Sequence, residues 1–226
     1  MPSITVGLDL GSANDHSALV AVERVYVLPP MISIAEWWRH PDTYAAALVE
    51  ERHVRHLQRW ELSTPYPAVV ADVAAAMRTP ALRDAWLVLD ATGVGRAVRD
   101  MFRLEHARSP IGCSFPAPIT VTAGRERSGW NVPKQDLVAA VQAPLQLGRL
   151  RIAESLALAP VLEKELTGFR LKIGANGRET VDIARQDGQG HGDLVSALML
   201  ACCWDNNLRR PDVVEYPIPT QGGNHA

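Results

Sequence analysis

Residues 4–22 constrain the fold more than any other part of the chain. They consist of two apolar, β-branched runs on either side of the small polar turn Gly11-Ser-Ala-Asn. Such a pattern predicts two strands joined as a hairpin. Asp9 is the exception, because it lies between Leu8 and Leu10 in the first run. An ionised carboxylate there is costly unless it is paired, hydrogen-bonded or bound to a cation. Asp9 therefore either accepts hydrogen bonds from the turn or belongs to a functional site.

A second aspartate ends a similar apolar strand, and a third opens a helix. Residues 85–90 are apolar up to Asp90 and are followed by a glycine turn and an amphipathic helix. Ligand sites of open α/β sheets lie at the carboxyl ends of the strands, so Asp9 and Asp90 are predicted to point into one place. Asp193 precedes the apolar helix 194–204, where a carboxylate suits the helix dipole and capping alone would explain it.

Three carboxylates in this arrangement suit a divalent-metal phosphodiesterase. Mg²⁺ prefers hard oxygen ligands and keeps several waters, so carboxylates without histidine or thiolate partners fit it better than they fit zinc. Two such ions can activate a water and stabilise the leaving oxygen of an in-line displacement. Without metal, the clustered acids would repel one another, which predicts raised proton affinity.

Several short motifs of the chain, in their order and spacing, resemble those of the nuclease domain of tailed-phage terminase large subunits. The resemblance runs from about residue 4 to residue 204. It is carried by Gly7-Leu-Asp9 with Asp15, Leu89-Asp90-Ala-Thr-Gly-Val-Gly95, Val132-Pro-Lys134, Glu165-Leu166 and Gly190-His191-Gly-Asp193-Leu-Val-Ser-Ala-Leu198. It implies an α/β, ribonuclease-H-like mixed β-sheet flanked by helices, with an additional β-hairpin near the active site. It also implies an Mg²⁺- or Mn²⁺-dependent endodeoxyribonuclease, which hydrolyses double-stranded viral DNA with a metal-activated water during genome packaging.

The resemblance assigns roles to individual residues. Asp9, Asp90 and Asp193 become the catalytic, metal-binding carboxylates for one or two ions, and Asp15 a nearby acidic group. His191 could orient substrate or Asp193, although capping of the last helix explains it equally well. The family often has two adjacent acids after this histidine, but here Gly192 replaces the first. This substitution puts the binding of a second ion in question.

Basic residues in two segments are candidates for phosphate contacts. One segment is the polar loop 123–130 with the start of the following helix. The other is a hairpin predicted over residues 169–173 and 179–185 by the turn Gly174-Ala-Asn-Gly177. An ordinary solvated loop explains the first segment equally well. The DNA-binding candidates are Arg125, Arg127, Lys134, Arg170, Lys172, Arg178 and Arg185.

Further elements follow from hydrophobic periodicity and from proline and glycine. We expect an irregular or short-helical insert at 35–44 that packs Trp37 and Trp38 against the body, with stacking of these two side chains on bases as the alternative. Helices are expected at 134–142 and 156–166, and a strand within 111–122. A strand at 51–60, a helix at 66–77 and the strand at 85–90 imply a partly parallel sheet.

Composition indicates one domain, residues 1–208, followed by a flexible tail, residues 209–226, that is rich in proline and glycine. The formal net charge of −2 means that any DNA-binding surface must be local. The three cysteines form neither a disulfide framework nor a zinc pattern. No apolar run is long enough to span a bilayer, and the N-terminus lacks the features of a signal peptide, so we expect no membrane association and a cytoplasmic location, in the host cell if the gene is viral.

The chain contains no Gly-x-x-x-x-Gly-Lys-Ser/Thr phosphate loop. If it acts in packaging, it is either a nuclease domain of a longer polypeptide or a separate nuclease beside a packaging ATPase. The resemblance adds the small terminase subunit and the portal as partners. Two rival functions remain: a non-catalytic DNA-binding or assembly module, made plausible by Gly192, and an actin-like or sugar-kinase ATP-binding lobe, which Gly7-Leu-Asp9-Leu-Gly11-Ser also resembles.

Overall fold

The computed structural model describes residues 4–12, 14–109, 117–120, 130–173, 179–183, 192–204 and 220–221. For residues 117–120, 130, 169–173, 179–183 and 220–221 it describes the backbone alone.

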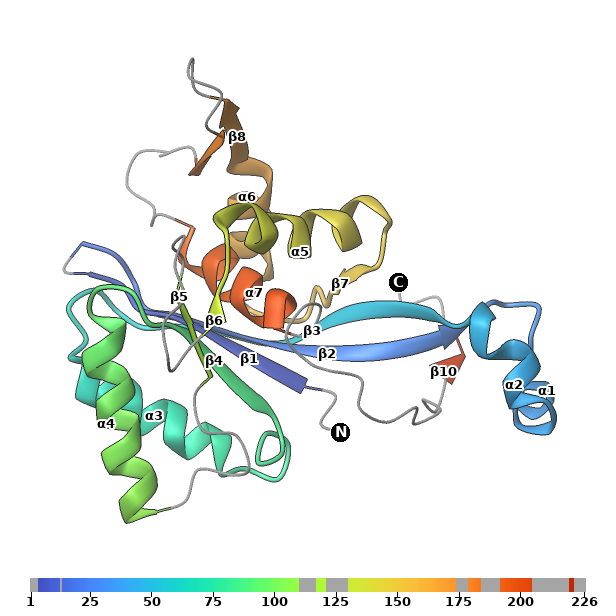
Figure 1. The fold of residues 1–226 in the computed structure, drawn as a ribbon, viewed down its shortest axis with the longest axis horizontal. Helices are drawn as coiled ribbons and strands as arrows, with labels where there is room; N and C mark the ends of the chain where they lie inside the picture. Colours follow the sequence, from blue (N-terminus) through green and yellow to red (C-terminus); the bar gives the residue numbers. More distant parts are fainter. Residues whose placement is uncertain are drawn as a thin grey trace.

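A mixed sheet forms the centre of the molecule (Figure 1). Its strands lie in the order β6-β5-β4-β1-β2-β3-β7, and β10 pairs with β2. β1 pairs with β2 and β2 with β3 in antiparallel fashion, whereas β1 pairs with β4, and β4 with β5, in parallel. The sheet strands are β1 (Ile4–Asp9), β2 (Ala18–Leu28), β3 (Val49–Arg59), β4 (Trp86–Asp90), β5 (Ala117–Thr120), β6 (Trp130–Asn131), β7 (Leu150–Ile152) and β10 (Thr220–Gln221). The predicted hairpin and the predicted parallel portion are both confirmed.

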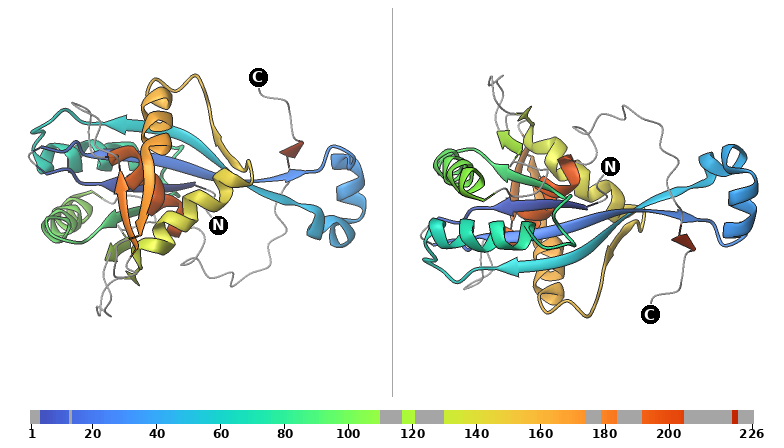
Figure 2. Two further views of the ribbon diagram at one scale, coloured as in Figure 1. Left: turned by 90° about the horizontal axis from the view of Figure 1, so that it is seen from above. Right: turned by 90° about the horizontal axis from the view of Figure 1, so that it is seen from below.

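Helices cover both faces of this sheet, as the two views in Figure 2 show. One face carries α3 (Tyr66–Met77) and α4 (Gly95–Arg108). The other carries α5 (Lys134–Gln146), α6 (Ala159–Gly168) and α7 (Asp193–Cys203). Alternate strand residues divide between two buried cores, because successive side chains of a strand point to opposite faces. Leu8 and Leu19 face α3 and α4, while Ala18 and Val20 face α7.

Strands β2 and β3 continue beyond the body as a two-stranded arm (Figure 1). The arm ends in the short segments α1 (Ile34–Arg39), α2 (Pro41–Tyr44) and η1 (Ala45–Ala47). These are the short helices expected for the insert. Trp37 is buried within this tip (Figure 1) and belongs to neither core of the body, and Trp38 is 59% exposed, so the expected packing of the two tryptophans against the body is wrong.

The second predicted hairpin is present as a separate two-stranded sheet of β8 (Phe169–Ile173) and β9 (Glu179–Ile183). The helix expected at 156–166 begins only at Ala159, with Pro160 in its first turn, where a missing backbone N–H costs nothing. The helix expected at 134–142 extends to Gln146.

Strands β6, β7 and β10 were not expected. β10 places Thr220–Gln221 of the segment 209–226, expected to be a flexible tail, beside the end of β2. In the part of the chain that is described, we find no helix with the length and apolar character needed to cross a bilayer.

Candidate active site

Strand register brings two of the predicted acids together. β1 and β4 run in parallel with Leu8 opposite Leu89, so the next residues, Asp9 and Asp90, are neighbours at the carboxyl ends of the two strands. Asp9 also pairs with Ala18 on β2. Residues in register across a sheet share one face, and Ala18 belongs to the face covered by α7. Both carboxylates therefore lie on the α7 side of the sheet.

Gly7 lets α7 approach this strand closely. A Cβ atom at Gly7 would overlap the carbonyl oxygen of Ala197, so α7 packs directly on the backbone of β1. Asp9 lies two residues beyond Gly7, about 6–7 Å along the strand. Asp193 lies one turn before Ala197, about 6 Å along the helix. These two steps place the first turn of α7 beside Asp9, and the charge of Asp193 acts directly on Asp9.

Asp9 is the most strongly perturbed acid of the site. Its pKa is raised from 3.8 to about 8, first by burial and then by the carboxylates of Asp193, Asp90 and Asp15. A hydrogen bond from the Leu10 backbone opposes this rise. The four aspartates thus lie close enough for their charges to interact, and Asp9 bears most of the cost.

Asp193 has a different environment from Asp9. Burial raises its pKa as well, but Arg59 and His16 oppose the rise. The Arg59 Nη2 donates to Asp193 Oδ2 at 3.1 Å. Arg59 lies opposite Ala18, so Asp9, Ala18 and Arg59 form one row across three strands. The Asp193 end of the site therefore contains a cation of its own.

Glu165 of α6 is a further buried acid in this neighbourhood. Its Oε2 accepts a hydrogen bond from the Val195 backbone at 3.0 Å, which satisfies a free N–H of the first turn of α7. Burial raises the pKa of Glu165 to about 7, and the charge of Asp193 adds to the rise. Gly192, the N-cap residue of α7, makes no side-chain cap, so Glu165 supplies this bond from another helix.

The turns that carry Asp90 and Asp15 are held by local hydrogen bonds. Asp90 Oδ1 accepts from the Thr92 backbone at 2.8 Å, which fixes the carboxylate at the start of the turn into α4. Asp15 Oδ2 accepts from the Ser12 hydroxyl at 2.8 Å. His16 Nδ1 lies 2.7 Å from the Trp60 carbonyl oxygen, which ties the β1–β2 turn to the end of β3.

The charge and donor chemistry of these residues fit a hard divalent cation. Three carboxylates act on Asp9, which is costly unless a cation neutralises them. Their oxygens are the ligands that Mg²⁺ and Mn²⁺ prefer. Among the described residues, however, no three acid, histidine or cysteine side chains already stand together as a metal-binding set.

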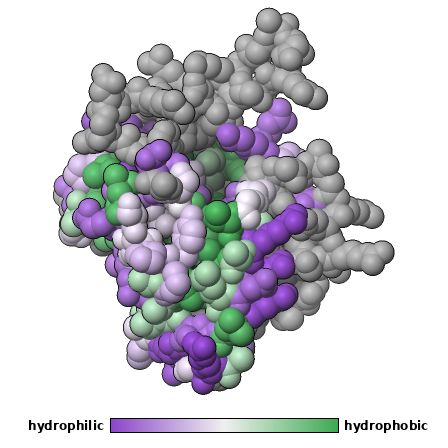
Figure 3. Space-filling view, turned by 90° about the vertical axis from the view of Figure 1, so that its left-hand side faces the viewer, coloured by the Kyte–Doolittle hydropathy of each residue, from purple (hydrophilic) through white to green (hydrophobic). Residues whose placement is uncertain are grey.

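The other predicted residues are placed only in part. Lys134 is exposed at the first position of α5, and Arg170 and Lys172 lie on β8, where only the backbone is described. Outside the described residues lie Arg125, Arg127, Arg178, Arg185 and His191. The surface at the end of the molecule that carries the β1–β2 turn, α3 and α4 shows hydrophilic side chains on both sides of an apolar band (Figure 3).

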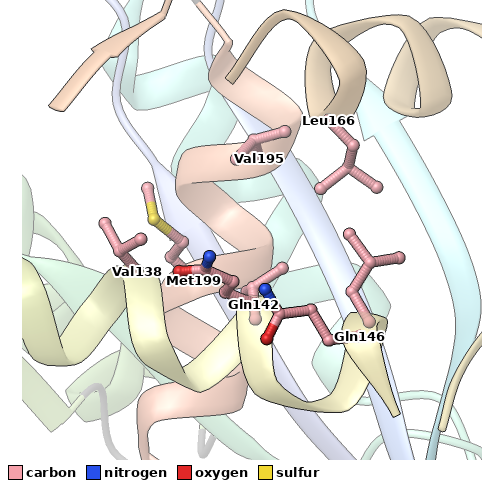
Figure 4. Close-up of a pocket in the computed structure, with 8 residues that line it drawn as sticks. Val138, Gln142, Gln146, Leu166, Val195 and Met199 are labelled. Carbon is pink, nitrogen blue, oxygen red and sulfur yellow. The ribbon is translucent and has the colours of Figure 1, made fainter. Parts of the chain in front are cut away.

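A separate pocket of about 240 Å³ lies between α5, α6 and α7 (Figure 4). Its lining is apolar apart from Gln142 and Gln146. These side chains offer no group for acid–base or metal chemistry, so the aspartate cluster is the better candidate for an active site.

Comparisons with known proteins agree with the resemblance seen in the sequence. No protein-family model matches the chain, and no significant relative is found among curated proteins. Solved structures do match. The large terminase nuclease of thermophilic phage G20c with bound magnesium is 21% identical, with a TM-score of 0.55 over 89% of this chain and 80% of that one.

Two further structures come from other viruses. The nuclease domain of the bacteriophage SPP1 large terminase with bound Mn is 13% identical, with a TM-score of 0.50 over 90% of this chain and 86% of that one. The human cytomegalovirus terminase nuclease domain is 11% identical, with a TM-score of 0.51 over 92% and 85%.

The chain has the fold of a terminase nuclease domain. The resemblance and the ribonuclease-H-like α/β class expected from the sequence are thereby confirmed at the level of the fold. Within this terminase nuclease fold, sequence reasoning did not identify Arg59, Glu165 or His16 as part of the acidic neighbourhood. Glu165 occurs in one of the quoted motifs, which was a usable signal. Arg59 had none, because its position depends on the register of β3.

Proposed function

We propose that the protein is a metal-dependent DNA endonuclease of the terminase type. The observation that carries this proposal is the convergence of Asp9, Asp90 and Asp193 from β1, β4 and α7 on one face of the sheet. The terminase nuclease fold supports it, and so do the magnesium and manganese bound in the matching structures from G20c and SPP1. Double-stranded viral DNA, cut during genome packaging, is the proposed substrate.

Asp9, Asp90 and Asp193 would hold one or two Mg²⁺ or Mn²⁺ ions, with Asp15 near them. A bound ion would supply an activated water and stabilise the leaving oxygen of the scissile phosphodiester. The chain's own residues set the geometry. The Thr92 N–H orients Asp90, and the Leu10 N–H orients Asp9.

DNA would be guided to these acids by basic side chains. We propose Arg125, Arg127, Lys134, Arg170, Lys172, Arg178 and Arg185 for this role, and His191 as an accessory group. Phosphate contacts dominate the affinity of such proteins, so they need not read the sequence. A packaging ATPase domain or subunit, the small terminase subunit and the portal are the proposed partners, and the host cytoplasm is the proposed location. Residues 1–208 would form the nuclease domain.

Cleavage of supercoiled plasmid tests this proposal. We expect Mg²⁺ or Mn²⁺ to support nicking, a chelator to stop it, and Asp90→Asn to lower the rate by about 100-fold or more. Asp100→Asn is the matched control, because Asp100 is an exposed aspartate of α4 whose side chain is 63% accessible. Cleavage by Asp90→Asn at the wild-type rate would refute the assignment.

A second candidate is a DNA-binding module that does not cut. The Arg59–Asp193 ion pair favours it, because it already neutralises one of the three acids. Plasmid binding without nicking in either metal would support this second function. The matching structures are nuclease domains, so the ATP-binding lobe is not proposed.

A further inference from the structure

We propose that Arg59 acts as a built-in cation at Asp193 and takes the place of a second divalent ion. The chain would then bind a single metal ion through Asp9 and Asp90, and Asp193 would bind Arg59 instead, so this inference narrows the three-carboxylate ligand set proposed above to two. This inference rests on the proposed nuclease function and specifies its metal stoichiometry. Arg59 would be a positioning residue, which acts through Asp193.

The first argument is the placement of Arg59. Arg59 ends β3 in the row that also contains Ala18 and Asp9, so its side chain starts on the face that carries the site. Its Nη2 donates to Asp193 Oδ2 at 3.1 Å, and the two side chains are only 15% and 4% exposed. A charge-assisted hydrogen bond between groups this well shielded is stronger than a surface ion pair.

The second argument is the uneven distribution of charge. Asp9 ends β1 beside Asp90 at the end of β4, and the carboxylates of Asp193, Asp90 and Asp15 all act on it. Asp193 is hydrogen-bonded to Arg59 at 3.1 Å, although the carboxylates of Asp15 and Glu165 also lie in its neighbourhood. The Asp9 end therefore needs an external cation, whereas the Asp193 end already has one.

The third argument concerns the free donors and acceptors around Asp193. Gly192 adopts a left-handed conformation, φ 82°, which suits glycine, and it offers no second carboxylate beside Asp193. The Arg59 Nε is buried and makes no hydrogen bond within the described residues. Arg59 thus points its guanidinium into the acidic neighbourhood with a donor to spare. A divalent ion at Asp193 would have to displace a tethered guanidinium and lie against its positive charge.

Mn²⁺ binding to the intact chain, measured by calorimetry and by electron paramagnetic resonance, tests the proposal without relying on activity. We expect wild type to bind one ion tightly. Asp90→Asn should weaken this ion by about 100-fold, whereas Asp193→Asn should change its affinity by less than about threefold, because Asp193 binds Arg59 instead. Both replacements are isosteric, and circular dichroism tests whether each variant is folded.

Arg59→Gln should create a second Mn²⁺ site, or strengthen a weak one by about tenfold or more, because the competing charge is gone. Arg59→Lys keeps a cation and should retain one ion. Arg55→Gln is the matched control on the same strand, since Arg55 pairs with Glu23 at 2.7 Å and is half exposed.

Two ions of similar affinity in wild type would overturn the inference, as would a folded Arg59→Gln variant that still binds only one. If Arg59→Gln does not fold, the Asp193→Asn result decides, because loss of the tight ion there contradicts the proposal. In these cases the nuclease assignment survives. Absence of Mn²⁺ binding in wild type would instead reject both the inference and the metal-dependent function.

Discussion

Replacement of Asp9 by asparagine should make the metal-free protein more stable while abolishing cleavage. Asp9 lies where two neighbouring strands and a helix start bring acids together, and its pKa is raised from 3.8 to about 8. The folded state therefore holds a proton that the unfolded chain releases above about pH 4. Each pH unit of this difference is worth about 1.4 kcal/mol, so at pH 7 the carboxyl costs the folded state about 4 kcal/mol.

The direction of the pH dependence follows from the same shift. Because the pKa of Asp9 is raised in the folded protein, its contribution to stability is largest below about pH 4. That contribution is lost as the pH rises towards 8. Asparagine does not ionise, so the advantage of Asp9→Asn over wild type should be small at about pH 4 and should grow up to about pH 8. After allowance for relaxation around the charge, we expect a gain of about 2–4 kcal/mol at pH 7, or about 4–16 °C in melting temperature.

Thermal unfolding in chelator, followed by circular dichroism at several pH values, measures this effect. Asp100→Asn serves as the control, because it makes the same chemical change at an exposed position of α4. Added Mn²⁺ should stabilise wild type but leave Asp9→Asn almost unchanged, since binding to the folded state alone raises its stability. A stability difference that is flat or shrinks with rising pH would refute the picture of Asp9 as an uncompensated acid.

Three further outcomes are expected. Gly7→Ala should destabilise the protein by about 3 kcal/mol or more, because its Cβ overlaps the Ala197 carbonyl oxygen; an unchanged denaturant midpoint would contradict this. In urea titrations at about pH 8, Glu165→Gln should be at least as stable as wild type, because it keeps an acceptor for the Val195 N–H and removes a buried carboxyl whose pKa is raised to about 7; Glu165→Ala, which also loses the cap, should be about 1–2 kcal/mol less stable than Glu165→Gln. DNA affinity should fall by about 10³–10⁴ between about 50 and 200 mM salt if all seven proposed basic residues contact phosphate, and a salt-independent affinity in filter binding would exclude these contacts.

Local sequence patterns predict most of the fold. The β1–β2 hairpin, helix α3 and the β4–α4 unit follow from short-range signals, namely apolar periodicity, turn glycines and a proline at a helix start. Strands β6, β7 and β10 were missed, since each has two or three residues. Segments this short carry no periodicity, and they become strands only because a longer neighbour offers hydrogen bonds.

The residues of the site likewise divide into those that the sequence predicts and those that only the structure identifies. Asp9 and Asp90 were found because a charge at the end of an apolar strand is anomalous in the sequence itself. Arg59 was missed because a strand residue acquires neighbours through pairing register, which no local pattern encodes. The bulge between Ala21 and Val22 shifts that register within β2 and β3, so even correct strand assignments would not have aligned Arg59 with Asp9.

The row formed by Asp9, Ala18 and Arg59 makes the spacing between them as important as their identity. A one-residue shift of β2 against β1, which a deletion in the β1–β2 turn would favour, moves every side chain of β2 to the opposite side of the sheet. The ion pair between Arg59 and Asp193 would then be lost, although neither residue had been replaced. Length changes in the helical tip of the arm leave this alignment intact as long as the pairing of β2 with β3, from Val27 and Val49 inward, is kept. In an alignment of related sequences, insertions and deletions should therefore be common in the helical tip and rare in the β1–β2 turn.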